Sequence, residues 1–248
     1  MANKNNRLSD YLTWASAIVM IVALYMVFIY APTERTMGDM QRIFYFHVSS
    51  AWVGFFAFFV TLIASIAYLW KGTRRWDIVA LSSVEVGVTF MTMAIISGSI
   101  WAKVAWNVWW TWDPRLTTST ILWLIYASYL MLRNAIDEEA RQARFAAVHG
   151  IVGFVSVPIT FMAIRWWRTI HPVILDGGGF SLATPMLATM LFCIGTFTLL
   201  YFTLLIHRVH LEQLADMVRW LRGQMVGWSE EAWSTRPPDQ GPPDHPTN

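Results

Sequence analysis

Tryptophan is concentrated in one short stretch of this 248-residue chain. Five of the fifteen tryptophans lie within residues 101–112, here called the tryptophan segment: Trp101, Trp106, Trp109, Trp110 and Trp112. A helical path would place three of them on one face by the i, i+3, i+4 rule, which predicts a flat aromatic shelf of Trp106, Trp109 and Trp110. Such a shelf suits a large planar ligand. The alternative is an interfacial belt, because tryptophan accumulates where lipid meets water.

A proline and two charged residues follow the tryptophan segment. Pro114 lacks a backbone donor and disfavours helical geometry at the residue before it, so we expect a bend at which Asp113 and Arg115 project. Asp113 then has two interpretations. It accepts a hydrogen bond from Arg115, a ligand imidazole or an indole N–H, or it caps a helix that begins near Thr117.

The composition shows what kind of element must position these residues. Apolar residues make up 56% of the chain and charged residues 14%, against roughly 45–50% and 25% in soluble domains, so we expect a membrane protein. The single cysteine, Cys193, excludes an internal disulfide, a Cys-x-x-Cys redox pair and a covalent c-type heme site.

Six apolar runs are long enough to span a bilayer. The predicted fold is therefore an all-α polytopic membrane domain, residues 1–206, with helices at about 12–31, 47–70, 78–100, 117–134, 145–165 and 184–206. Pro158 is expected to kink the fifth helix. Residues 207–228 repeat apolar side chains every three or four positions, which predicts an amphipathic cytoplasmic helix. The stretch from Arg236 to Pro246 lacks apolar side chains to bury, and residues 229–248 are expected to be a disordered tail.

The distribution of basic residues predicts the orientation of these helices. Twelve of the eighteen Lys and Arg residues fall on the side that carries both termini. The positive-inside rule therefore places both termini in the cytoplasm and the tryptophan segment outside, so the candidate site is expected on the external face of the membrane.

The six histidines divide by the same topology. Four are predicted to be cytoplasmic, His149, His207, His210 and His245, whereas His47 and His171 lie outside, in the first and third outer connections. Each outer connection thus contributes a histidine or the tryptophan segment. A lone histidine at a membrane interface is usually just a hydrogen-bonded polar residue. Two histidines beside an aromatic platform instead match six-coordinate heme iron, which takes one imidazole above and one below the ring.

A heme site would also need cationic partners for two propionates. Five outer basic residues are near these elements: Arg42, Lys103, Arg115, Arg165 and Arg168. The sequence does not choose among them, and each has the alternative of contacting lipid headgroups or setting the topology.

Glu85 is an acidic residue inside the third span, where ionisable groups usually have a function and a partner. No partner is evident from the sequence. The chain has no Walker loop, dinucleotide fingerprint or catalytic serine motif, so energy for transport would come from another protein.

At this point the chain resembles protein C of the bacterial cytochrome c maturation system, a heme exporter subunit of the tryptophan-rich family of heme-handling proteins. Three local patterns carry the resemblance: Arg42 through Trp52, Trp106 through Thr117, and Pro158 through His171. It extends to about residue 206.

The resemblance implies that His47 and His171 are the axial ligands of noncovalently bound heme b. It also implies that Trp106, Trp109, Trp110, Trp112 and Asp113 help to form the external surface for heme and for a partner. The partners it implies are a membrane-anchored heme chaperone and the ATPase and permease subunits of an ABC transporter, within the lipid bilayer and without nucleic acid.

Two positions depart from the family pattern. The usual Trp-Gly-Thr-Trp-Trp is Trp106-Asn-Val-Trp109-Trp110 here, and the proline often found two residues after the first histidine is Ser49. Losing the glycine at Asn107 changes how closely a ring or partner can approach.

Three functions compete. The first is a non-catalytic protein that presents heme and passes it to a chaperone. The second is a heme lyase that attaches heme to apocytochrome c. The related synthetases with this activity are typically longer, and they typically have Trp-Asp-Pro-Lys-Glu where this chain has Trp-Asp-Pro-Arg-Leu. The third is a b-type electron-transfer subunit, for which ligands inside the spans would be expected. The single outer site favours delivery.

Overall fold

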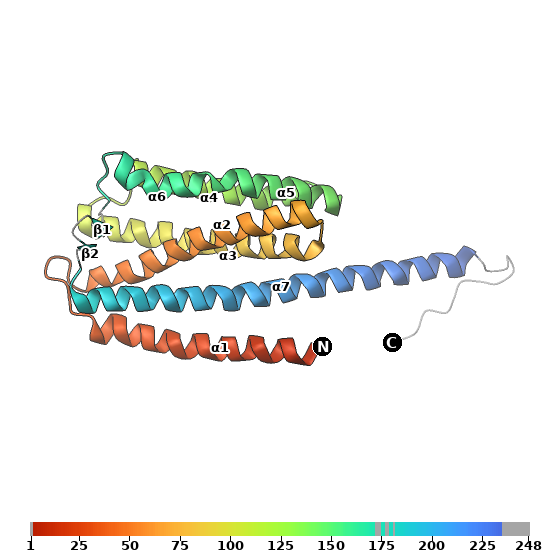
Figure 1. Cartoon of the computed structure of the whole chain (residues 1–248), viewed down its shortest axis with the longest axis horizontal. Helices are drawn as coiled ribbons and strands as arrows, with labels where there is room; N and C mark the ends of the chain where they lie inside the picture. The colour runs from red at the N-terminus through yellow and green to blue at the C-terminus, as the bar shows by residue number, and fades with distance from the viewer. Residues whose placement is uncertain (1, 172–174, 177–178, 181, 235–248) are drawn as a thin grey trace. The chain divides into compact units, whose positions relative to one another are not determined.

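The structure is a computed structural model and describes residues 2–171, 175–176, 179–180 and 182–234. These residues are almost entirely helical (Figure 1). The helices are α1 (Ala2–Tyr25), α2 (Ile43–Lys71), α3 (Arg74–Trp106), α4 (Pro114–Asn134), α5 (Glu139–Phe154), α6 (Ser156–Trp166) and α7 (Thr184–Ser234). A π-helical turn (Met26–Tyr30) continues α1, and a 3-10 turn (Asp39–Arg42) precedes α2. In the described part of the chain, the strands are two short antiparallel partners, β1 (Leu175–Asp176) and β2 (Gly179–Phe180).

Five helical segments are long and apolar enough to cross a membrane: Arg7–Tyr30, Asp39–Lys71, Arg74–Trp106, Glu139–Trp166 and Thr184–Met225. Helix α4 is more polar, but its 21 residues extend about 31 Å, enough for a bilayer core of about 30 Å. It packs against α3, α5 and α6, and hydroxyls in its first turns donate to its own backbone carbonyls. The chain is therefore an all-α, multi-pass membrane protein, as predicted.

Helices α2 and α3 form the central antiparallel pair, joined by a turn at Gly72 in the left-handed conformation. Helices α4 and α5 complete a core with this pair, in which the rings of Phe58 and Tyr126 stack with centroids 3.7 Å apart. A second core joins α2 and α3 to α7 around Val53, Phe90 and Tyr201.

The predicted kink at Pro158 is a break between α5 and α6. Proline has no N–H to donate and its ring clashes with the carbonyl four residues earlier, here that of Phe154. Helix α5 ends at that residue, and α6 begins at Ser156.

Helix α7 differs from the prediction of separate segments at 184–206 and 207–228. It is one helix from Thr184 to Ser234, whereas the sequence predicts a disordered tail from residue 229. Residues 235–248 lie outside the described residues. Residues 1–209 and 210–248 form two compact units. Within the second, Leu211, Leu214 and Val218 are exposed along the helix.

Two charge pairs fasten helices to one another. Asp77 of α3 and Arg133 of α4 are both buried and form two hydrogen bonds, of 2.5 and 2.9 Å. Glu85 of α3 and Arg208 of α7 also form an ion pair, with Nε of Arg208 2.5 Å from Oε2 of Glu85 and one hydrogen bond of 2.9 Å from Nη2 to Oε1. The partner of Glu85 that the sequence did not reveal is therefore Arg208.

Candidate functional site

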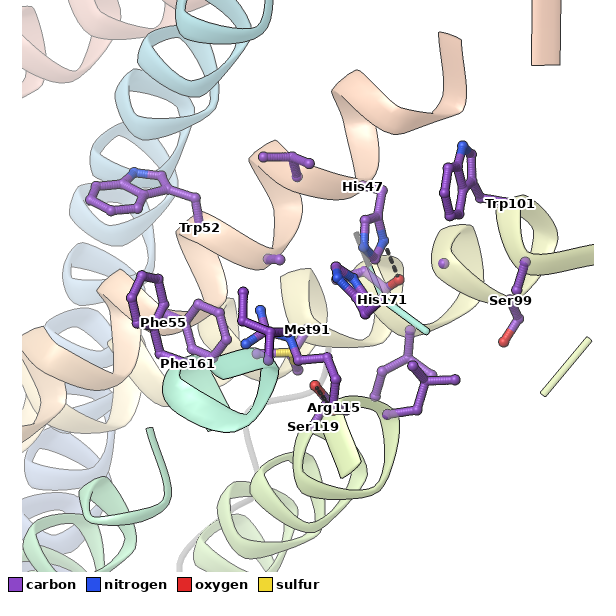
Figure 2. A pocket seen from close by; sticks show the side chains of 18 of the residues that line it. His47, Trp52, Phe55, Met91, Ser99, Trp101, Arg115, Ser119, Phe161 and His171 are labelled. Carbon is purple, nitrogen blue, oxygen red and sulfur yellow. Dashed lines mark hydrogen bonds between the residues drawn. The ribbon is translucent and has the colours of Figure 1, made fainter. Parts of the chain in front are cut away.

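His47 lies in the second turn of α2 and packs against α3. Its Nδ1 lies 2.9 Å from the carbonyl oxygen of Ala94, a hydrogen bond drawn in Figure 2. A carbonyl only accepts, so Nδ1 carries the proton and Nε2 keeps its lone pair. The imidazole is thus fixed in the tautomer that a metal ligand requires, with a backbone acceptor that orients the ring.

Gly98 of α3 makes room for this imidazole. A Cβ atom at Gly98 would come within 2.8 Å of Cε1 and 3.1 Å of Nδ1 of His47. Contacts between a Cβ and a ring are not found at such distances, so a larger residue would displace the ring. The sequence offered no sign of this role, because Gly98 is 51 positions from His47 and looks like any glycine in an apolar helix.

His171 reaches the same place from the segment that follows α6. The ring centroids of His47 and His171 are 6.4 Å apart, with an interplanar angle of 41°. A metal–imidazole bond is about 2 Å long, and each ring centre lies roughly 1 Å behind its nitrogen, so two imidazoles on opposite sides of one metal have centres about 6 Å apart. The two histidines predicted as ligands therefore stand at a separation that accommodates one metal ion.

The histidines line a cavity of about 300 Å³ between α2, α3, α4 and α6. Its walls are largely aromatic and aliphatic; Figure 2 shows Trp101 on one side of the imidazoles and Trp52, Phe55 and Phe161 on the other. Of the predicted aromatic residues, Trp106 and Trp110 also line it. The cavity reaches from His47 to Phe55, two helical turns farther along α2, or about 12 Å. It is thus long as well as apolar.

Arg115 places a cation inside this cavity. Its guanidinium donates to the carbonyl oxygen of Thr160 in α6 and lies 5.5 Å from the centre of the Phe55 ring. Among the described residues, no carboxylate forms an ion pair with Arg115. Arg115 is half-buried, and a cation partly removed from water without an anion is costly, so the arrangement favours an anionic ligand group at this position.

Of the other four predicted cations, Arg165 also lines the cavity, whereas Arg42, Lys103 and Arg168 do not. Arg42 pairs with Asp39 at 3.1 Å and donates to Val27, Ala31 and Thr33, which ties the start of α2 to the end of α1. Lys103 donates to the side chain of Asn107 at 2.9 Å, and Arg168 is exposed.

The tryptophan segment does not form the predicted flat shelf. Helix α3 ends at Trp106, and Trp109 and Trp110 follow outside any helix, so the i, i+3, i+4 relation does not hold. The indoles meet edge to face: Trp101 and Trp106 at 89°, Trp110 and Trp112 at 83°. This geometry is the usual preference of aromatic pairs. Trp110 faces the cavity, whereas Trp109 and Trp112 are 59% and 77% exposed.

Asn107 ends the helix because it adopts a left-handed conformation, with φ of 59°. Glycine adopts this conformation without strain, and asparagine is among the few other residues that tolerate it. The departure from the family glycine at this position is therefore compatible with the same turn. Its carbonyl and amide oxygens both accept from Lys103.

Asp113 fulfils the capping role and also a bridging one. Its Oδ1 accepts from the N–H of Arg115 at 2.9 Å, so α4 begins at Pro114 rather than at Thr117. Proline at the first helical position fits, since its missing N–H would have had no partner there. The same carboxylate accepts from the Thr169 hydroxyl at 2.6 Å and from the N–H of Ile170 at 3.0 Å. It therefore joins the tryptophan segment to the segment that carries His171.

The number of donor side chains limits which metal the site can hold. Within the described ranges, no group of three or more His, Cys, Asp or Glu side chains is arranged for a metal ion. Structural zinc takes four protein ligands and catalytic zinc three. Two imidazoles beside a long apolar cavity suit instead a metal whose other ligands come from a planar organic ring.

Sequence reasoning missed several cavity residues that come from the spans, among them Phe55, Met91 and Phe161. Their apolar side chains look like lipid-facing or core residues in any helix. For Trp52 the sequence does offer a cue, because an indole N–H inside a span needs an acceptor. In the structure this N–H donates to the hydroxyl of Thr198 in α7 at 3.0 Å.

Comparison with known proteins gives a consistent result. A sequence model of the family described as heme exporter protein C matches residues 1–222. The chain is 34% identical to heme exporter protein C of Bradyrhizobium diazoefficiens, over 92% of this chain and 87% of that protein. It is 31% identical to heme exporter protein C of Escherichia coli strain K12, over 65% of this chain and 66% of that protein. With the Haemophilus influenzae protein of the same description the identity is 28%, over 85% and 86%.

Proposed function

The chain belongs to the heme exporter protein C family, and on this premise we propose that it binds heme b noncovalently and delivers it to a heme chaperone during cytochrome c maturation. His47 and His171 are the two axial ligands in this proposal. The observation that carries it is the separation of 6.4 Å between their ring centres in an aromatic cavity that both histidines line.

The remaining residues of the cavity supply what a porphyrin needs besides iron ligands. Apolar walls such as Trp110 and Phe55 cover the ring faces and exclude water. Arg115, which has no carboxylate partner among the described residues, receives a propionate, and Arg165 is a second candidate. The Arg115 guanidinium lies 5.5 Å from the centre of the Phe55 ring, two turns from His47 along α2, and would hold a propionate there.

Delivery requires an exposed surface as well as a binding cavity. Trp109 and Trp112 are exposed beside the cavity, and Trp166 and Ile170 are exposed on the adjoining segment. Exposed aromatic residues grouped in this way favour contact with another protein. We assign these residues to the docking surface for a membrane-anchored chaperone.

The proposal includes the membrane context. The positive-inside distribution supports a site on the external face of the inner membrane. No nucleotide-binding motif occurs in the chain, so ATPase and permease subunits of an ABC transporter would supply the energy for handover. The protein itself acts as the binding and delivery subunit rather than as a lyase.

The ligation is tested with purified His47→Ala and His171→Ala variants. Each should lose the low-spin visible spectrum of heme with two imidazole ligands and should fail to pass heme to the chaperone. His149→Ala and His210→Ala are matched controls, because neither residue lines the cavity. An unchanged spectrum in the double variant would rule out the two-histidine site.

A second experiment tests whether Trp110 contributes to heme binding and Trp109 to heme transfer. Trp110→Ala should reduce heme occupancy, since its indole lines the cavity, whereas Trp109→Ala should leave occupancy near normal and reduce transfer to the chaperone. The measurements are heme content of the purified protein and heme recovered on the chaperone. Normal transfer in the Trp109 variant would mean that this indole is only part of an interfacial belt.

A further inference from the structure

The two histidines are held in different ways. His47 is part of α2, and its ring is fixed by the carbonyl of Ala94 and by the close approach of Gly98. His171 lies outside any helix, five residues after α6 ends at Trp166. A side chain on irregular backbone keeps a fixed position only if local hydrogen bonds hold that backbone.

Those hydrogen bonds converge on Asp113. The Thr169 hydroxyl donates to Oδ1 of Asp113 at 2.6 Å and accepts from the backbone N–H of His171 at 3.0 Å. The N–H of Ile170 donates to Oδ2 of Asp113 at 3.0 Å. One carboxylate and one hydroxyl thus hold the backbone N–H groups of two consecutive residues, Ile170 and His171. We call Asp113 and Thr169 the brace.

We infer that the brace positions His171 as an axial ligand and makes it the ligand that docking at the tryptophan segment releases first. This inference rests on the proposed function. Asp113 directly follows the exposed Trp112 and also caps α4. A partner that moves the tryptophan segment therefore pulls on the brace and on His171, while His47 stays anchored between α2 and α3.

The chemistry of handover fits this asymmetry. Two imidazoles would hold heme more firmly than one, so release of His171 while His47 stays bound would weaken the hold and leave room for a ligand from the receiving protein. A carboxylate hydrogen bond to Thr169 is charge-assisted and short, so it holds His171 well in the free protein. Asp113 directly follows Trp112, whose side chain is exposed. A partner that binds Trp112 can therefore disturb the hydrogen bond between Asp113 and Thr169.

The test removes the brace hydroxyl without removing either ligand. In Thr169→Val, the purified heme-loaded protein should show a rise of at least about fivefold in the ratio of high-spin to low-spin heme, because the loss of one hydrogen bond corresponds to about fivefold and this substitution removes two. Added imidazole should restore the low-spin spectrum by taking the position of His171. Thr169→Ser keeps the hydroxyl and should resemble the unmodified protein.

Thr117→Val is the matched control, because the Thr117 hydroxyl is buried one turn into α4 without a hydrogen-bond partner in the described residues. It should not change the spin ratio. His171→Ala provides the reference for complete loss of this ligand. If His171→Ala becomes high-spin but Thr169→Val stays low-spin, the brace is wrong and the two-histidine site stands. If His171→Ala itself stays low-spin, the proposed ligation is wrong.

Asp113→Asn extends the test to the partner. The amide NH₂ cannot accept the hydrogen bond from Ile170, so this variant should also raise the high-spin fraction. With unmodified protein, adding the apo-chaperone should produce the same high-spin shift before heme is transferred. A chaperone that removes heme with no such intermediate would overturn the release order.

Discussion

Single side chains at the histidine site depend on small distances. The Nδ1 atom of His47 is bonded to Ala94, and the ring edge lies against the backbone of Gly98. These contacts decide whether Nε2 faces the cavity. The site is therefore sensitive to changes that add even one methyl group on α3.

Gly98→Ala should perturb the site without unfolding the protein. The added Cβ would lie 2.8 Å from Cε1 of His47, so the imidazole must rotate or give up its bond to Ala94. We expect lower heme occupancy and a higher high-spin fraction, measured by visible spectroscopy.

Gly195→Ala is the control for Gly98→Ala. Gly195 lies in α7, and a Cβ there meets nothing within 4 Å. Both substitutions favour helix by similar amounts, so any difference in heme binding reports the contact with His47. Equal heme spectra in the two variants would contradict the role given to Gly98.

Helices are joined at the opposite end of the bundle by a buried charge pair. Asp77 at the start of α3 and Arg133 at the end of α4 are 2% and 4% exposed. Arg133 also donates to Gln142 of α5 at 3.2 Å, and Arg74 approaches Asp77 as well. Three helices thus share one polar network, which fixes their relative register.

Arg133→Met should therefore be strongly destabilising. Removing one partner of a buried pair leaves an uncompensated charge and costs about 3–5 kcal/mol; the remaining contact of Asp77 with Arg74 favours the lower value. Thermal unfolding of the purified protein in detergent measures the effect. The double variant Asp77→Leu, Arg133→Met should recover much of the loss, because no buried charge is left alone.

Arg219→Met is the comparison for that experiment. Arg219 pairs with Asp216 on the second unit, but its side chain is 52% exposed, and exposed pairs contribute about 0–1 kcal/mol. Its unfolding temperature should hardly change. A comparable loss in both variants would argue against a special role for the buried network.

At the scale of the whole molecule, the proposal requires one end of the bundle to face outward. The start of α2 and α4 and the ends of α3 and α6 meet at the cavity. Gly72, in the turn between α2 and α3, marks the opposite end of that helix pair. The two ends must therefore lie on different sides of the membrane.

Reporter fusions test this orientation. An enzyme active only outside the cytoplasm should be active when fused after Asn107 or after Gly178, and silent when fused after Gly72 or at the C-terminus. The physical reason is the excess of Lys and Arg on the side of the termini. The reverse pattern would place the cavity in the cytoplasm and end the delivery proposal.

The sequence by itself determined the class of the protein and the identity of its helices. Hydropathy and proline position are local properties, and they predicted a polytopic all-α fold and a kink at Pro158, where the structure has a break between α5 and α6. The pairing of His47 with His171 was also predicted, because topology assigns all connections on one side to the same end of a bundle. The structure brings the two imidazoles together.

Only the tertiary structure decided how the site is built. The sequence suggested a helical tryptophan shelf, but Asn107 turns left-handed and ends α3 at Trp106. It grouped Arg42 with the other cations, but Arg42 holds the end of α1. It left Glu85 without a partner, although Arg208 lies 123 positions away. Each of these outcomes depends on contacts between distant parts of the chain, which neither periodicity nor composition records.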